Sequence, residues 1–156
     1  MTTLMTQNPA MRGEKIYEYE FDITGVTDYG VSMDAILANK EAIPLQGARF
    51  DLAVTGRGKG RLSGRAHGVD YLRIRADGRI ELDLHVTVET DDGRRIALSG
   101  DGQAAPRKDE PIMDIFANIR LSTAAKEYAW VNARQIWAVG TASLATGKMH
   151  VEAYMQ

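Results

Sequence analysis

Hydrophobic and polar residues alternate with a period of two along most of this chain, which is the pattern of strands with one buried face. The clearest run is residues 79–89, where five aliphatic side chains alternate with polar ones. Turn sequences centred on Asp77-Gly78 and Asp92-Gly93 flank this run. The pattern therefore predicts a meander in which strands at 71–75 and 95–98 pair with the central strand.

Further strands are predicted at both ends of the sequence. Residues 15–23 alternate aromatic or aliphatic residues with acids, and residues 131–144 and 148–155 flank a short loop that ends in Gly147. Helix signals are few and short, at residues 32–39 and 122–128. Many strands with frequent turns favour an all-β protein, an antiparallel β-barrel or barrel-like sandwich with one or two short helices.

Chain length and composition fit one domain. The 156 residues are 44% hydrophobic and 26% charged, within the usual range for one globular unit. Residues 1–13 are predicted to be a flexible tail and residues 14–156 a single barrel domain, with residues 102–111 as a mobile loop and candidate lid. No stretch is apolar enough for a membrane span or a signal peptide, so we expect a cytoplasmic protein that does not bind membranes.

Charge and residue usage exclude several kinds of chemistry. The formal net charge of −2 and the absence of cysteine argue against nucleic acid as a partner and against thiolate or Cys-ligated metal chemistry. The three histidines are far apart in sequence, and no glycine-rich segment has the spacing of a nucleotide-binding loop. We therefore expect no metal and no cofactor.

Several sequence blocks together resemble a known family. They are the segment from Pro44 to Gly64, Gly68-Val69-Asp70-Tyr71-Leu72 with Ala76-Asp77-Gly78 and Leu82-Asp83, Glu89-Thr90-Asp91-Asp92-Gly93, and Tyr128-Ala129-Trp130-Val131-Asn132 followed by Val139-Gly140-Thr141. In this order they resemble the family called domain of unknown function 3237, over roughly residues 44–155. The resemblance implies a small β-barrel that pairs as a dimer and has no established general activity. This chain departs from the family pattern in two places. It reads His67-Gly68-Val69-Asp70-Tyr71 where the family tends to have two glycines, an Asp and a Trp, and it has His85 where Arg is common.

Two aspartates are candidate catalytic acids or bases. Asp70 and Asp83 belong to the blocks just described, and an apolar barrel interior would disfavour the charged form of a carboxyl group that faced it. The simpler interpretation is that Asp70 caps a turn and that Asp83 faces water beside Glu81.

Histidine and aromatic residues supply candidate substrate-binding groups. Histidine is the side-chain type whose charge can change near neutral pH, which singles out His67 and His85, and His85 shares a strand face with Asp83. Such a pair is also common on a solvated strand face. Tyr71 and Trp130 complete the set of candidate substrate-binding residues.

Tyr128, Trp130 and Asn132 share one side if their segment is extended. A tyrosine hydroxyl and an asparagine amide so placed could polarise a carbonyl oxygen, which makes Tyr128 and Asn132 candidate catalytic residues. Alternatively, Tyr128 and Trp130 simply bury apolar area in a core.

These residues leave two function classes open. One is a cofactor-independent acid/base enzyme, of the isomerase, lyase or cyclase type, that acts on a small carbonyl compound. The other is a noncatalytic binding protein for a small apolar metabolite. In both, the partner is a small-molecule ligand. Exposed strand edges and the apolar positions around Trp137 further predict a homodimer.

Overall fold

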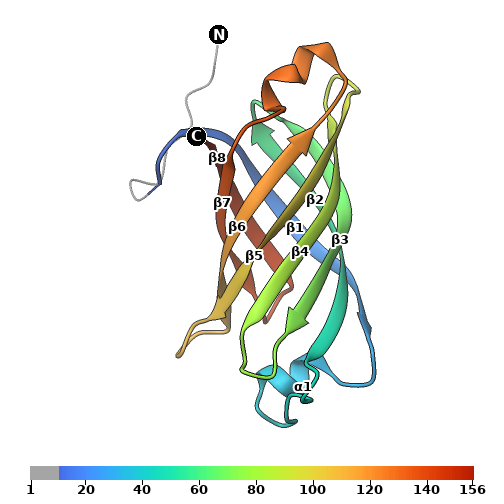
Figure 1. The fold of residues 1–156 in the computed structure, drawn as a ribbon, viewed down its shortest axis with the longest axis vertical. Helices are drawn as coiled ribbons and strands as arrows, with labels where there is room; N and C mark the ends of the chain where they lie inside the picture. The colour runs from blue at the N-terminus through green and yellow to red at the C-terminus, as the bar shows by residue number, and fades with distance from the viewer. Residues whose placement is uncertain (1–10) are drawn as a thin grey trace.

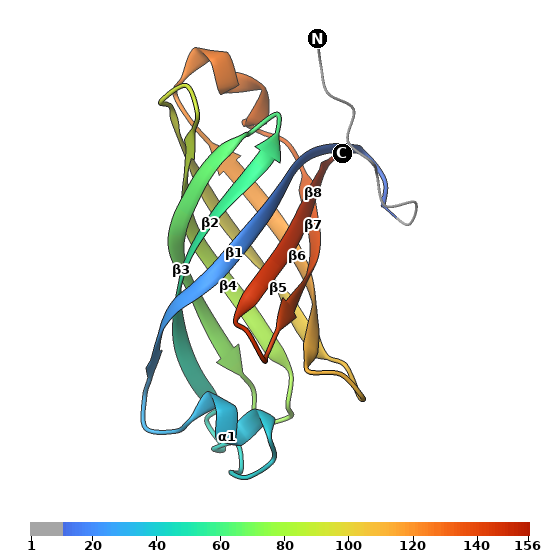
Figure 2. The ribbon, with the colours of Figure 1, turned by 180° about the vertical axis from the view of Figure 1, so that it is seen from behind.

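The computed structural model describes residues 11–156 and shows a closed antiparallel barrel, in which each strand pairs with its neighbours in chain order and β8 pairs back to β1. The predicted fold class is thereby confirmed. The strands are β1 (Glu14–Asp28), β2 (Ala48–Gly60), β3 (Gly64–Ile74), β4 (Ile80–Thr90), β5 (Arg95–Pro106), β6 (Ile112–Ser122), β7 (Ile136–Ser143) and β8 (Lys148–Met155). Two short helical segments, α1 (Met33–Leu37) and η1 (Lys126–Val131), lie at opposite ends of the barrel (Figures 1 and 2).

Period-two alternation sets which side chains enter the barrel. On β4 the side chains at even positions, from Ile80 to Val88, are mostly buried, whereas Glu81, Asp83 and His85 are exposed. The predicted meander of β3, β4 and β5 is present, with Asp70 opposite Leu84 in the register. An eight-stranded barrel has an interior just wide enough to fill with side chains or to hold one small ligand.

Several predicted boundaries differ from the structure: β3 begins at Gly64 rather than at residue 71, and β1 continues to Asp28 rather than ending at residue 23. Strand β5 continues to Pro106, so the predicted mobile loop at 102–111 is reduced to a turn. Arg107 of this turn pairs with Asp114 of β6 at 2.9 Å. The turn contributes nothing to the cavity lining described below, and it is not a lid. Strand β7 begins at Ile136, because residues 126–131 form η1 and residues 132–135 form a turn that leads into the strand.

The end of the barrel that carries η1 is closed by packed apolar side chains. Leu62 from the β2–β3 turn, Ile96 from β5 and Val131 from η1 are fully buried there in one cluster. At the opposite end, Ile36 of α1 packs with a second cluster from β2 to β6. Ser32 caps α1 by accepting a hydrogen bond from the Ala35 N–H at 3.3 Å, in the segment predicted to be helical.

Two glycines on β2 make room for aromatic rings inside the barrel. Gly58 lies opposite Tyr19, and Gly56 lies opposite Phe21. A Cβ atom on Gly58 would come within 2.0 Å of the Tyr19 ring, and one on Gly56 within 2.6 Å of the Phe21 ring. The rings therefore lie against the wall, and the Tyr19 and Phe21 rings stack with centroids 5.7 Å apart.

Barrel closure also bears on association. Every described strand has two partners, so the free edges on which the dimer prediction partly rested do not exist in residues 11–156. Trp137, however, does lie on the outer face, with 39% of its surface exposed.

Neither described helical segment has the length and hydropathy of a membrane-crossing helix. The predicted tail, residues 1–13, falls outside the described residues except for its last three, and β1 begins at Glu14.

Candidate functional site

A cavity of about 290 Å³ lies inside the barrel, near the lower end of the range of volumes of small-molecule sites. It runs from a rim at the α1 end, formed in part by Val26, Asp34 and Leu144, to Tyr17 and Leu62 near the closed end. Val26 and Leu144 are exposed, whereas Leu62 is fully buried. The cavity is therefore a deep pocket with one opening.

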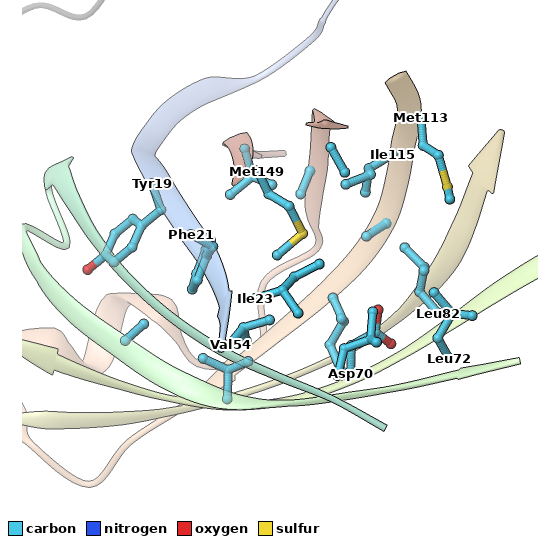
Figure 3. A pocket seen from close by; sticks show the side chains of 18 of the residues that line it. Tyr19, Phe21, Ile23, Val54, Asp70, Leu72, Leu82, Met113, Ile115 and Met149 are labelled. Atoms are coloured by element: carbon cyan, nitrogen blue, oxygen red, sulfur yellow. The ribbon is translucent and has the colours of Figure 1, made fainter. Parts of the chain in front are cut away.

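The pocket wall is almost entirely apolar. Aromatic rings from β1 form one side, aliphatic residues from β2 to β8 form most of the rest, and Met113 of β6 and Met149 of β8 add methionine side chains (Figure 3). Among the described lining residues the ionisable groups are two tyrosines, Asp34 at the rim and Asp70 in the interior; lysine, arginine and histidine are absent from this lining. Asp70 is thus the one carboxyl group that the described lining places deep in an apolar environment.

Asp70 is placed in the pocket by the alternation of β3. Its side chain points inward in the same direction as Leu72, and only 8% of its surface is exposed (Figure 3). Burial raises the pKa of this carboxyl group to about 7, because the charged form loses hydration. Two smaller effects partly cancel: the hydrogen bond from the Asp83 N–H lowers the pKa, and the Asp83 charge raises it.

The strand pairing is interrupted beside Asp70. Register partners of β3 and β4 run as far as Asp70 and Leu84 and resume at Arg73 and Glu81. Within this gap, the Asp83 backbone N–H donates to Asp70 Oδ1 at 3.1 Å. The carboxyl group thus takes the acceptor role that a carbonyl group of β3 has elsewhere in the ladder. Oδ1 is held in place, and Oδ2 has no hydrogen-bond partner among the described residues.

The other acidic candidate lies outside the barrel. The Asp83 carboxyl group lies 3.0 Å from His85 Nε2, and the side chains of Asp83 and His85 are 60% and 58% exposed. The Tyr71 ring meets the His85 ring edge-on at 5.5 Å, and His67 is exposed on the same outer face of β3. These four residues form a surface group that the barrel wall separates from Asp70, and they cannot contact a ligand in the pocket.

The aromatic block near residue 130 is also remote from the pocket. The segment is not extended but forms the 3-10 helix η1, so the predicted common side of Tyr128, Trp130 and Asn132 is wrong. The Tyr128 hydroxyl donates to Asp92 Oδ1 at 2.9 Å. The Asn132 amide donates to the Thr123 carbonyl at 2.9 Å and accepts from its N–H at 3.0 Å. Tyr128 and Asn132 hold the closed end of the barrel together and do not reach a pocket ligand.

Trp130 lies outside the barrel interior as well. Its ring is covered by the Arg61 guanidinium group at 3.7 Å from the ring centroid, a cation–π contact. Sequence reasoning assigned no site role to Tyr17 and Tyr19, which do line the pocket. The signal was present in the alternation of residues 15–23, which puts both rings on the inner face.

One cluster of potential metal ligands lies on the outer face of β1 and β8. Glu18, His150 and Glu152 have ligand atoms within 4.8 Å of one another. The Lys15 ammonium group already pairs with both glutamates and lies 2.6 Å from Glu152 Oε1, and His150 Nδ1 is 2.5 Å from Glu20 Oε1. The cation of this cluster is therefore a lysine, and we interpret it as a structural ion-pair group.

Comparison with known proteins gives a family and a fold. The model of the family "Protein of unknown function (DUF3237)" matches residues 30–155. No curated protein matches the sequence significantly.

Three solved structures are similar along nearly their whole length. A protein of unknown function from Clostridium acetobutylicum ATCC 824 has 16% identity and a TM-score of 0.75, covering 93% of this chain and 99% of that one. A beta-barrel like protein from Acinetobacter baumannii AYE has 21% identity and a TM-score of 0.71, covering 97% and 99%. A protein from Penicillium herquei has 17% identity and a TM-score of 0.62, covering 97% and 100%. At these identities the likeness shows the barrel fold.

Proposed function

We propose that this chain, which belongs to the DUF3237 family, uses its barrel as a cofactor-independent acid/base site for a small, largely apolar carbonyl compound. The observation that carries this proposal is the buried carboxyl group of Asp70, placed in an apolar pocket with one oxygen fixed and the other free. The Penicillium herquei neighbour is described as an enzyme, which supports a catalytic role for this fold.

The chemistry follows from the pKa of Asp70. A pKa of about 7 makes both the acid and the carboxylate abundant near neutrality, which suits a group that takes up and returns a proton. In this proposal the Asp70 carboxylate removes a proton from the carbon next to a carbonyl group and later returns it to the same or another atom. Isomerisation, elimination and ring closure all contain such a step.

Hydrogen exchange tests this proposal before the natural substrate is identified. Ketones such as cyclohexanone and acetophenone are incubated with the protein in D₂O, and proton NMR measures the loss of the C–H signal next to the carbonyl group. We expect exchange that increases as the pH rises through about 7, because the carboxylate is the base. Asp70→Asn should lower the exchange rate by roughly 10²- to 10⁴-fold.

Asp83→Asn is the matched control, because it removes a carboxyl group from the outer face of the same region. We expect this variant to keep exchange close to the wild-type rate. Equal rates for wild type and Asp70→Asn would contradict the proposal. Binding of the ketones without any exchange would favour the second candidate function, a noncatalytic binding protein, which the almost wholly apolar lining supports.

A further inference from the structure

Two neighbouring tyrosines on the inner face of β1 differ in what their hydroxyl groups do. Tyr17 and Tyr19 both line the pocket, and their rings meet edge-on with centroids 5.3 Å apart. The Tyr19 hydroxyl donates to the Leu62 carbonyl at 2.6 Å, and in Figure 3 it points away from the middle of the pocket. The Tyr17 hydroxyl has no hydrogen-bond partner among residues 11–156.

The Tyr17 hydroxyl keeps some accessible surface although the residue as a whole is only 4% exposed. Among the described residues no fully buried side-chain oxygen lacks a hydrogen-bond partner, so an unpaired hydroxyl here must be open to a ligand or to water. Burial also raises the pKa of Tyr17, so the hydroxyl keeps its proton and remains a donor over the physiological pH range. A phenol with these properties that borders a pocket is suited to donate to an oxygen atom of a ligand.

Tyr17 and Asp70 lie at different depths of the pocket. Tyr17 pairs with Gly60 at the end of β2, whereas Asp70 pairs with Leu52, eight residues earlier on that strand. One carbonyl group cannot therefore contact both. A ligand that uses both groups must be elongated, with its reactive part beside Asp70 and a second polar atom near the closed end.

We propose that Tyr17 is a specificity-determining residue, whose hydroxyl donates a hydrogen bond to an oxygen atom at the inner end of an elongated, largely apolar ligand. The inference rests on the proposed function in that it assigns a ligand to the same pocket. The ligand class is uncharged, because the described lining has no cationic side chain to pair with a carboxylate or phosphate. Tyr17 acts by positioning the ligand, and Asp70 remains the residue that transfers the proton.

Two isosteric probes test this role. Acetophenone and α-methylstyrene have nearly the same shape, but the carbonyl oxygen of the first is replaced by a CH₂ group in the second. Their affinities are measured by displacement of the neutral fluorophore N-phenyl-1-naphthylamine at pH 9, where Asp70 is ionised and cannot donate. At this pH the hydroxyl donors of the described pocket lining are Tyr17 near the closed end, Tyr19, which is bonded to Leu62, and Ser143.

The measured quantity is the ratio of the two affinities, acetophenone over α-methylstyrene. Tyr17→Phe should lower this ratio about five- to tenfold, the effect of one neutral hydrogen bond. Tyr19→Phe is the matched control and should leave the ratio unchanged, because the Tyr19 hydroxyl is bonded to Leu62. Tyr17→Phe should also unfold at the wild-type urea concentration, since its hydroxyl has no protein partner to lose.

An unchanged ratio in Tyr17→Phe would overturn the inference and leave the role of Asp70 intact. Equal hydrogen-exchange rates for wild type and Asp70→Asn would contradict the proposed function and leave the role of Tyr17 intact. The two outcomes are distinguishable because the affinity ratio at pH 9 does not depend on proton transfer. Failure of the fluorophore and of both probes to bind the wild-type protein would overturn the pocket assignment and both proposals with it.

Discussion

Replacing Asp70 by asparagine should stabilise the protein, and the gain should depend on pH. In the folded chain the pKa of Asp70 is raised from 3.8 to about 7 by burial. Between these pH values the folded state therefore binds a proton that the unfolded state has released. Stability is thus lost as the pH rises from about 4 to about 7 and stays low above that.

The expected magnitude follows from the shift. Each pKa unit corresponds to about 1.4 kcal/mol, so a shift of roughly three units amounts to about 4 kcal/mol once the pH is well above 7. At pH 5 only about a third of this destabilisation is present. Asparagine has no charge to desolvate and retains a carbonyl oxygen for the Asp83 N–H. The stability gain of Asp70→Asn should therefore be about 3 kcal/mol larger at pH 9 than at pH 5.

Urea unfolding of both proteins at pH 5 and pH 9 measures this difference. Asp109→Asn is the control, because Asp109 is exposed in the β5–β6 turn and its replacement removes the same charge from the chain. We expect the control to show no comparable pH dependence. A stability difference between wild type and Asp70→Asn that is equal at the two pH values would show that Asp70 is not the buried titrating group.

Three further predictions concern packing, ion pairing and association. Gly58→Ala should lower the free energy of unfolding by about 1–3 kcal/mol, because its Cβ atom would displace the Tyr19 ring; a melting temperature equal to wild type would disagree. Lys15→Met should destabilise by about 2–3 kcal/mol, because it removes the buried ammonium group that pairs with Glu18 and Glu152, while Lys59 stays 3.8 Å from Glu18. Glu152→Gln in that background should restore part of the loss in urea unfolding. Trp137 and the neighbouring apolar outer face should form a homodimer contact. Light scattering at about 50 μM should therefore show a dimer for the wild-type protein and a monomer for Trp137→Glu. A monomeric wild-type protein would refute association.

The barrel was predictable because strand alternation is a local signal. Residues 79–89 and 148–155 show which side chains are buried without any knowledge of their neighbours, and the structure has strands at Ile80–Thr90 and Lys148–Met155. Closure was harder to foresee, because it depends on the register between the first and last strands, Glu14 with Met155. No local pattern encodes that pairing, which is why free edges were expected.

The site was only partly predictable for the same reason. Asp70 and Asp83 have similar sequence surroundings, yet they belong to opposite faces of neighbouring strands, and the strand register decides which one enters the pocket. Tyr128 and Asn132 were placed on one side by assuming an extended segment, and the 3-10 helix removes that relation. Tyr17 was visible as an inward residue, but its unpaired hydroxyl is a property of the folded chain alone.

The closed end of the barrel has a consequence for the order of events in the proposed reaction. Because Leu62 and its neighbours seal one end, a product formed beside Asp70 under the proposed function must leave past the same rim, near Val26 and Leu144, by which the next substrate arrives. Product and incoming substrate therefore exclude each other. We expect competitive product inhibition, strongest for reactions such as isomerisation whose product is as large and as apolar as the substrate.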